Sequence, residues 1–69
     1  MKPSSVLRAY EELQVRGWQY AAADAWSCWA LGQQYTQPRG IDRYTAALIE
    51  AANWEIESEN RTANSVRAS

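Results

Sequence analysis

The stretch VRGWQYAAADAWSCW, residues 15–29, decides how this chain folds, because it contains the first glycine and three of the four tryptophans. Gly17 has two interpretations. As a helix end, it would follow Arg16 in the last turn and take the left-handed position that favours glycine. As a helix interior, it would cost about 1 kcal/mol relative to alanine and mark a close approach of two backbones.

The apolar pattern around Gly17 favours a continuous helix. Steps of 3.6 residues trace one stripe that is apolar or small except at a single acid, and the stripe keeps its phase through the glycine. The residues after the glycine also offer no N-cap for a new helix. We therefore predict one helix from about Ser5 to about Tyr35, capped by the serine hydroxyls at its start. The stripe consists of Val6, Tyr10, Leu13, Gly17, Ala21, Asp24, Cys28, Leu31 and Tyr35.

A turn and a second helix follow. The proline and glycine of TQPRG, residues 36–40, are expected to end the first helix and reverse the chain. Apolar residues then repeat at helical spacing from Ile41 to Ser58, which predicts a second, antiparallel helix. Residues 59–69 show no apolar period, so a polar, disordered tail is expected after a helical domain over residues 1–58.

Two helices alone cannot enclose a core, so a partner helix pair is expected. The predicted fold is all-α: an antiparallel two-helix hairpin that pairs into a symmetric dimer and forms a four-helix bundle. A chain of 69 residues with one cysteine and no histidine has no disulfide or zinc site to support it otherwise. The expected dimer interface is Tyr10, Leu13, Gly17, Ala21, Asp24, Cys28 and Leu31.

Asp24 is the one acid on this stripe, and three interpretations stay open. It can accept a hydrogen bond from a Trp, a Tyr or Arg43 and so fix the register of the pairing, since a buried carboxylate needs a partner. It can lie at the solvated edge of the helix. It can pair with a basic group of a binding partner.

Composition argues against several classes of function. The charges nearly balance, with seven Lys plus Arg and eight Asp plus Glu, so nucleic acid is not an expected direct ligand. No apolar run is long enough to cross a membrane, and a lone cysteine agrees with a reducing compartment, so a soluble cytoplasmic protein is expected. Without histidine or paired acids, we expect no catalytic residue, no metal and no cofactor.

The aromatic residues favour recognition of another protein. The chain has four Trp, four Tyr and no Phe, and Trp and Tyr suit half-wet interfaces. Two helices cannot bury all of these rings, and Trp, Tyr and Arg dominate binding hot spots. The acidic end of the second helix is either a solvated face or a complement to a basic surface. The predicted partner contacts are Trp26, Tyr35, Arg39, Arg43 and Trp54.

In length and layout, the segment SSVLRAYEELQVRGWQYAAADAWSCWALGQQY, the turn TQPRG and the segment IDRYTAALIEAANWEIES resemble small bacteriophage anti-host proteins of the anti-activator, or anti-quorum-sensing, type. This resemblance implies a helical dimer that binds a LuxR-type host transcription activator and blocks its DNA binding, and it extends to inhibition of a pilus-assembly ATPase. No signature motif accompanies it, so no functional residue is carried over. An anti-CRISPR protein and a small structural or assembly adaptor are the alternatives.

Overall fold

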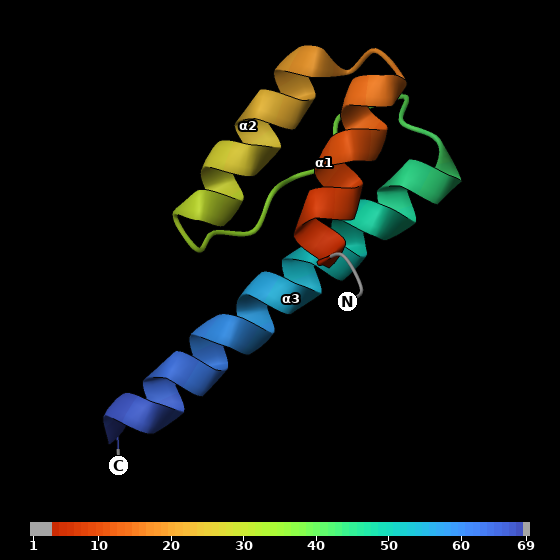
Figure 1. Ribbon diagram of the computed structural model, residues 1–69. Helices are drawn as coiled ribbons and strands as arrows, with labels where there is room; N and C mark the ends of the chain where they lie inside the picture. The colour runs from red at the N-terminus through yellow and green to blue at the C-terminus, as the bar shows by residue number, and fades with distance from the viewer. Residues whose placement is uncertain (1–3, 69) are drawn as a thin grey trace.

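In the computed structural model, which describes residues 4–68 and the side chains of residues 4–62, the chain forms three helices. They are α1 (Ser5–Val15), α2 (Gln19–Ala30) and α3 (Arg43–Ala68). α1 and α2 form an antiparallel hairpin, and α3 packs against α1 and extends beyond both (Figure 1). The described part of the chain is entirely helical and loop, but the predicted two-helix hairpin is wrong.

The predicted first helix breaks at Gly17. This residue has a φ of +89°, and the hydrogen bonds around it form a Schellman motif. The Gly17 N–H donates to the Gln14 carbonyl at 3.1 Å, and the Trp18 N–H donates to the Leu13 carbonyl at 2.8 Å. α2 then begins without a side-chain cap. A missing N-cap therefore did not exclude a helix start, because the first residues of α2, Gln19 and Tyr20, are exposed to solvent.

Replacing Gly17 tests this turn. We expect Gly17→Ala to lower the free energy of unfolding by about 1–2 kcal/mol, because an L-residue is strained at positive φ. An added Cβ meets nothing within 4 Å, so no clash contributes. A synthetic chain with D-Ala at position 17 should lose no stability. Urea unfolding of the three chains is the measurement, and equal losses for both alanines would contradict the turn.

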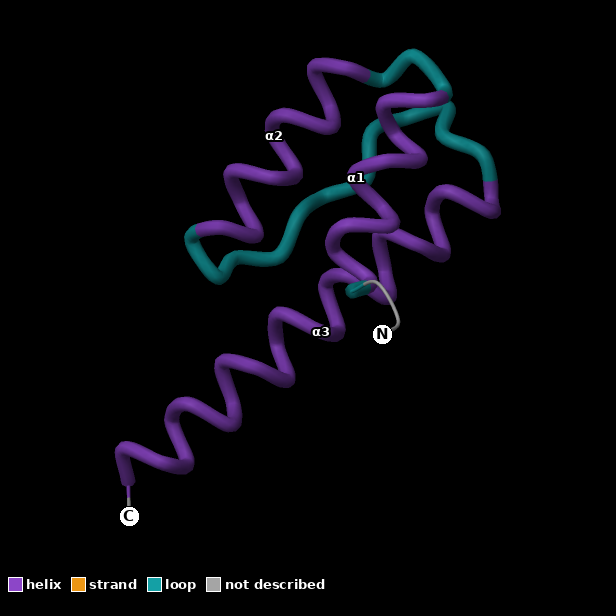
Figure 2. Tube along the Cα trace, in the orientation of Figure 1, coloured by secondary structure: helices purple, strands orange, loops and turns teal. Residues whose placement is uncertain are grey.

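α2 ends at Ala30, five residues before the predicted end at Tyr35, and a second glycine follows it. Gly32 has a φ of +72°, and the Gln33 N–H donates to the Cys28 carbonyl at 2.8 Å, which repeats the Schellman pattern. The chain then leaves the helix well before Pro38. Residues 31–42 form a long loop that connects the end of α2 to the start of α3 (Figure 2).

The break at Gly17 changes which face of α2 is buried. The predicted stripe placed Ala21, Asp24 and Cys28 inside, but the buried positions lie one residue further along, a rotation of about 100°. The turn resets the helical phase, so a stripe extrapolated through it is misplaced. The buried hydrophobic core consists of Ala9, Leu13, Ala22, Ala25, Trp29, Ile49, Ala52 and Ile56.

α3 begins two residues later than predicted and continues ten residues past the predicted end at Ser58. The Asp42 carboxylate caps its start by accepting the Thr45 N–H at 3.0 Å and the Thr45 hydroxyl at 2.8 Å. Beyond Ser58, Arg61 pairs with Glu57 at 3.0 Å, one turn earlier. The backbone of the predicted disordered tail is therefore helical through Ala68; Ser69 lies outside the described residues.

The cap on α3 predicts a pH effect. The Thr45 backbone N–H and hydroxyl lower the pKa of Asp42, and Arg16 adds to this effect. Since the folded pKa lies below the unfolded one, this stabilisation is present above the unfolded pKa and is lost as the pH falls below about 4. Asp42→Asn still accepts a hydrogen bond but does not titrate. Urea midpoints from about pH 6 to pH 3 should fall less steeply in the variant; identical slopes would contradict this role of Asp42.

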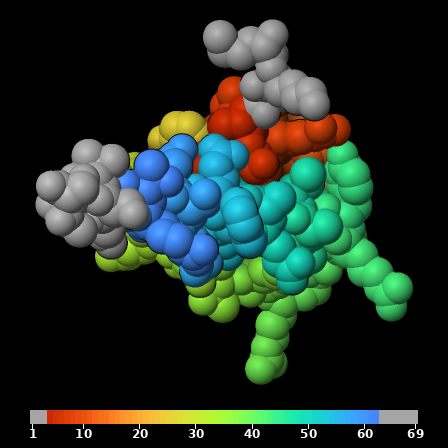
Figure 3. All heavy atoms as spheres, turned by 90° about the horizontal axis from the view of Figure 1, so that it is seen from below, coloured from red at the N-terminus to blue at the C-terminus, as the bar shows by residue number. Residues whose placement is uncertain are grey.

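Asn53 joins α3 to α2 and to the long loop. Its Oδ1 accepts the Trp29 indole N–H and the Tyr35 backbone N–H, both at 2.9 Å. Its Nδ2 donates to the Tyr35 carbonyl, also at 2.9 Å. The Tyr35 ring lies edge-on to Trp29, with the ring centres 6.1 Å apart. One amide thus fixes the loop, and Figure 3 shows α3 flanked by α1 on one side and by the loop on the other.

A dimer of hairpins forms a four-helix bundle only if each chain has two helices. With α1, α2, α3 and the loop, the chain encloses its own core. Leu13, a predicted dimer contact, is fully buried in that core. The predicted four-helix bundle of two hairpins is therefore wrong, and dimerisation itself stays a prediction.

Candidate protein-binding surface

Two tryptophans remain at the surface of the folded chain. Trp26 is 44% exposed on α2, and Trp54 is 68% exposed on α3. Part of the Trp26 ring packs on Tyr10, with the ring centres 4.9 Å apart. Tryptophan combines a large apolar area with a polar N–H group, so an exposed ring that is partly held in place is well suited to bind another protein.

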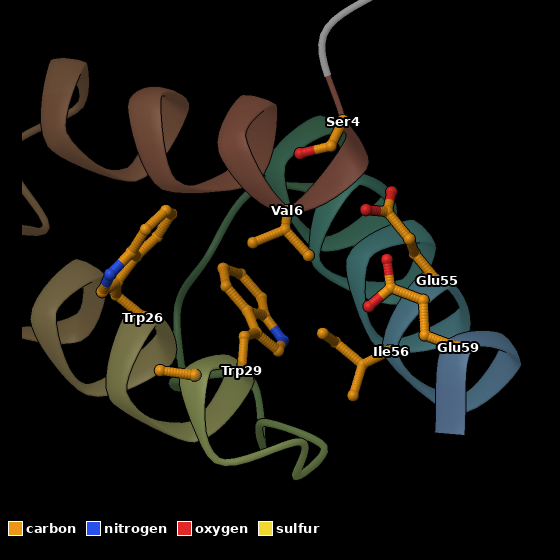
Figure 4. A pocket seen from close by; sticks show the side chains of 8 residues that line it. Ser4, Val6, Trp26, Trp29, Glu55, Ile56 and Glu59 are labelled. Carbon is orange, nitrogen blue, oxygen red and sulfur yellow. The ribbon is translucent and has the colours of Figure 1, made fainter. Parts of the chain in front are cut away.

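Trp26 lines a groove between α1, α2 and α3 with a volume of about 290 Å³. Val6, Trp29 and Ile56 contribute apolar side chains (Figure 4). Trp26 comes from one side of the groove, and two carboxylates of α3 come from the other. The full lining is Ser4, Val6, Trp26, Trp29, Ala30, Glu55, Ile56 and Glu59. We call this the Trp26 groove.

Trp54 lines a second hollow of about 460 Å³, the Trp54 groove, together with Ser5, Ala51, Glu55, Ser58 and Glu59. Glu55 and Glu59 line both grooves and lie one turn apart on α3. The two tryptophans therefore belong to one composite surface, in which an acidic stretch of α3 contributes to both hollows.

The two shared carboxylates differ in their partners. Glu55 accepts the Ser5 backbone N–H at 2.7 Å, so it satisfies one of the free donors at the start of α1. The Ser4 hydroxyl satisfies another by accepting the Leu7 N–H. Glu59, in contrast, forms no hydrogen bond or ion pair within residues 4–62. Glu59 is thus the carboxylate of this surface with the fewest internal bonds.

A third groove, of about 370 Å³, contains Asp24. This acid is exposed and has no hydrogen bond or ion pair within residues 4–62, which matches the second interpretation, a position at the solvated edge. Tyr35 lines the same groove. Burial raises the pKa of the Tyr35 hydroxyl, and Asp24 and Cys28 act in the same direction. The hydroxyl is therefore a neutral hydrogen-bond donor at neutral pH.

The predicted partner contacts do not form a single cluster. Trp26 and Trp54 line neighbouring grooves, whereas Tyr35 lines the third groove. Arg39 lies exposed in the loop and Arg43 lies exposed at the start of α3, and neither lines any of the three grooves. Of the predicted dimer contacts, Leu13 is buried, Tyr10, Ala21 and Cys28 are half-buried, and Gly17, Asp24 and Leu31 are exposed.

The sequence did not predict the role of Asn53, which joins α3 to α2 and to the loop. A signal was present, because Asn53 lies four residues after Ile49 and three before Ile56, on the buried side of α3. An amide at such a position needs partners. The sequence predicted a serine cap at Ser4 and placed Val6 on the apolar stripe, but it did not predict that both line the Trp26 groove, since the contact of α1 with the middle of α3 depends on the tertiary fold.

Comparison with protein-family models, curated proteins and solved structures finds no match to this chain. Within the described residues, no three His, Cys, Asp or Glu side chains come together in a way that could hold a metal ion. None of the described helices has the length and apolar character needed to span a membrane.

Proposed function

We propose that this protein is a non-enzymatic inhibitor that binds a basic surface of a regulatory protein, namely the DNA-binding part of a transcription activator. The observation that carries the proposal is the composite surface of the Trp26 and Trp54 grooves, with Glu55 and Glu59 common to both. Exposed tryptophans beside carboxylates complement a surface rich in lysine and arginine.

DNA-binding surfaces have this composition, because they neutralise phosphates with lysine and arginine. A protein that presents carboxylates and aromatic rings can cover such a surface and exclude DNA from it. The resemblance to phage anti-activators suggests a LuxR-type quorum-sensing activator as the first target to test. The inhibitor then acts by occupancy and needs no chemistry of its own.

The test begins with capture of partners from a bacterial lysate and continues with the purified activator and its operator DNA. Wild-type protein should bind the activator and release the DNA in a gel-shift assay. Trp26→Ala and Trp54→Ala should each weaken binding at least about tenfold, the effect of a hot-spot residue.

Tyr20→Ala is the matched control, because Tyr20 is 90% exposed and lies outside both grooves. Circular dichroism checks that each variant is folded. Unchanged affinity in the Trp26→Ala, Trp54→Ala double variant would contradict the proposed surface. Recovery of only the protein itself, in assemblies that grow with concentration, would favour the structural adaptor.

A further inference from the structure

The Trp26 groove combines two kinds of surface that few ligands match at once. Val6, Trp29 and Ile56 offer apolar contacts, and Figure 4 shows the Glu55 and Glu59 carboxylates together at one side of the groove. A purely apolar ligand would leave these carboxylates partly desolvated without a partner, which is unfavourable. A small anion would be repelled. The groove therefore favours a ligand with an apolar stem and a cationic head.

Lysine and arginine side chains both have this form, since their stems pack on apolar surface while the charged head reaches polar groups. The guanidinium of arginine has a further advantage here, because its planar array of donors fits a carboxylate in two parallel hydrogen bonds. The half-exposed Trp26 ring is available to the apolar stem.

The carboxylates of Glu55 and Glu59 have different roles. Glu55 already accepts the Ser5 N–H at the start of α1, so its orientation is fixed. Glu59 is free of ion pairs within residues 4–62, whereas Glu57, on another face of α3, is paired with Arg61. Glu59 is thus the acceptor for a new cation, and Glu55 adds negative potential beside it.

We infer that the Trp26 groove binds one arginine side chain of the partner protein, with its stem across Trp26 and Val6 and its guanidinium at Glu59. This inference deepens the proposed function and rests on it, because it names the group of the basic surface that the groove holds. The occupant belongs to a partner protein; an arginine from a second copy of this chain is one outcome of the test.

The test uses N-acetyl-arginine-N-methylamide as the probe and ¹⁵N-labelled full-length protein, observed by NMR. The expected result is a saturable shift of the Trp26 indole signal and of the Glu59 amide signal, with weak affinity that falls as salt is added. The citrulline analogue has nearly the same shape without the charge and should give no saturable shift. The lysine analogue should bind more weakly than arginine.

Glu59→Gln should reduce the affinity for the arginine probe about fivefold or more, because it removes the charge of a paired acceptor. Glu57→Gln is the matched control and should leave the affinity unchanged, since Glu57 lines neither groove. Equal shifts with the citrulline analogue, or no saturable shift with arginine, would overturn the inference. So would a dimer in which a second copy already fills the groove, seen by sedimentation.

Failure here is distinguishable from failure of the proposed function. If Trp54→Ala weakens binding to the activator but the arginine probe does not bind, the inhibitor function stands and the arginine site is wrong. If the probe binds as described but no activator is inhibited, the groove is a cation-binding site and the inhibitor function is wrong.

Discussion

An Asn53→Ala variant is expected to lose about 2–4 kcal/mol of folding free energy, a large share of the stability of so small a domain. The substitution leaves three partly buried groups without a partner: the Trp29 indole N–H, the Tyr35 N–H and the Tyr35 carbonyl. It also releases the loop from α3. Thermal unfolding should show the loss as a fall of about 4–8 °C in Tm for each kcal/mol.

Asn60→Ala is the matched control, because Asn60 makes a single, exposed hydrogen bond to the Gly32 carbonyl at 2.7 Å. It should cost less than about 1 kcal/mol. Asn53→Asp should fall between the two, since a carboxylate keeps the acceptor but loses the donor to Tyr35. Equal effects of Asn53→Ala and Asn60→Ala would show that Asn53 does not organise the core.

The second large effect is expected from Leu13→Ala, at about 3–5 kcal/mol. Leu13 is fully buried among the three helices, so truncation removes apolar contacts and leaves a cavity. Leu31→Ala makes the same chemical change at another residue of the predicted apolar stripe. Leu31 is 74% exposed, so its truncation should change stability by less than about 0.5 kcal/mol.

Urea unfolding at several protein concentrations distinguishes a core formed within one chain from a core formed in a dimer interface. If Leu13 packs within one chain, its loss lowers the midpoint equally at every concentration. If Leu13 and Leu31 both lay in a dimer interface, both variants would be destabilised, and the midpoints would rise with concentration.

The sequence was sufficient to predict helices and the start of α1, where Ser4 is the cap. It was not sufficient to place the break at Gly17, because the apolar period happens to continue in phase across a turn of three residues. The positive φ of Gly17 and the backbone hydrogen bonds to Leu13 and Gln14 distinguish the two conformations. As a result, the wrong face of α2 was predicted to be buried.

The candidate surface was predictable in part. Trp26 and Trp54 follow from an excess of rings over what the helices can bury, and both are exposed. Their relation to Glu55 and Glu59 was not predictable, because it depends on how the start of α1 packs against the middle of α3. Helical periodicity indicates which side of a helix is apolar, but not which helix covers it.

The chain holds Trp29 inside through Asn53 and leaves Trp26 and Trp54 exposed at the surface. Hydrogen exchange of the four indole N–H groups, followed by NMR, tests it in one experiment. The Trp29 indole should be strongly protected, because it donates to Asn53, and those of Trp26 and Trp54 should exchange rapidly. Rapid exchange at Trp29, or protection of Trp26 and Trp54 as strong as that of Trp29, would contradict both the core and the proposed surface.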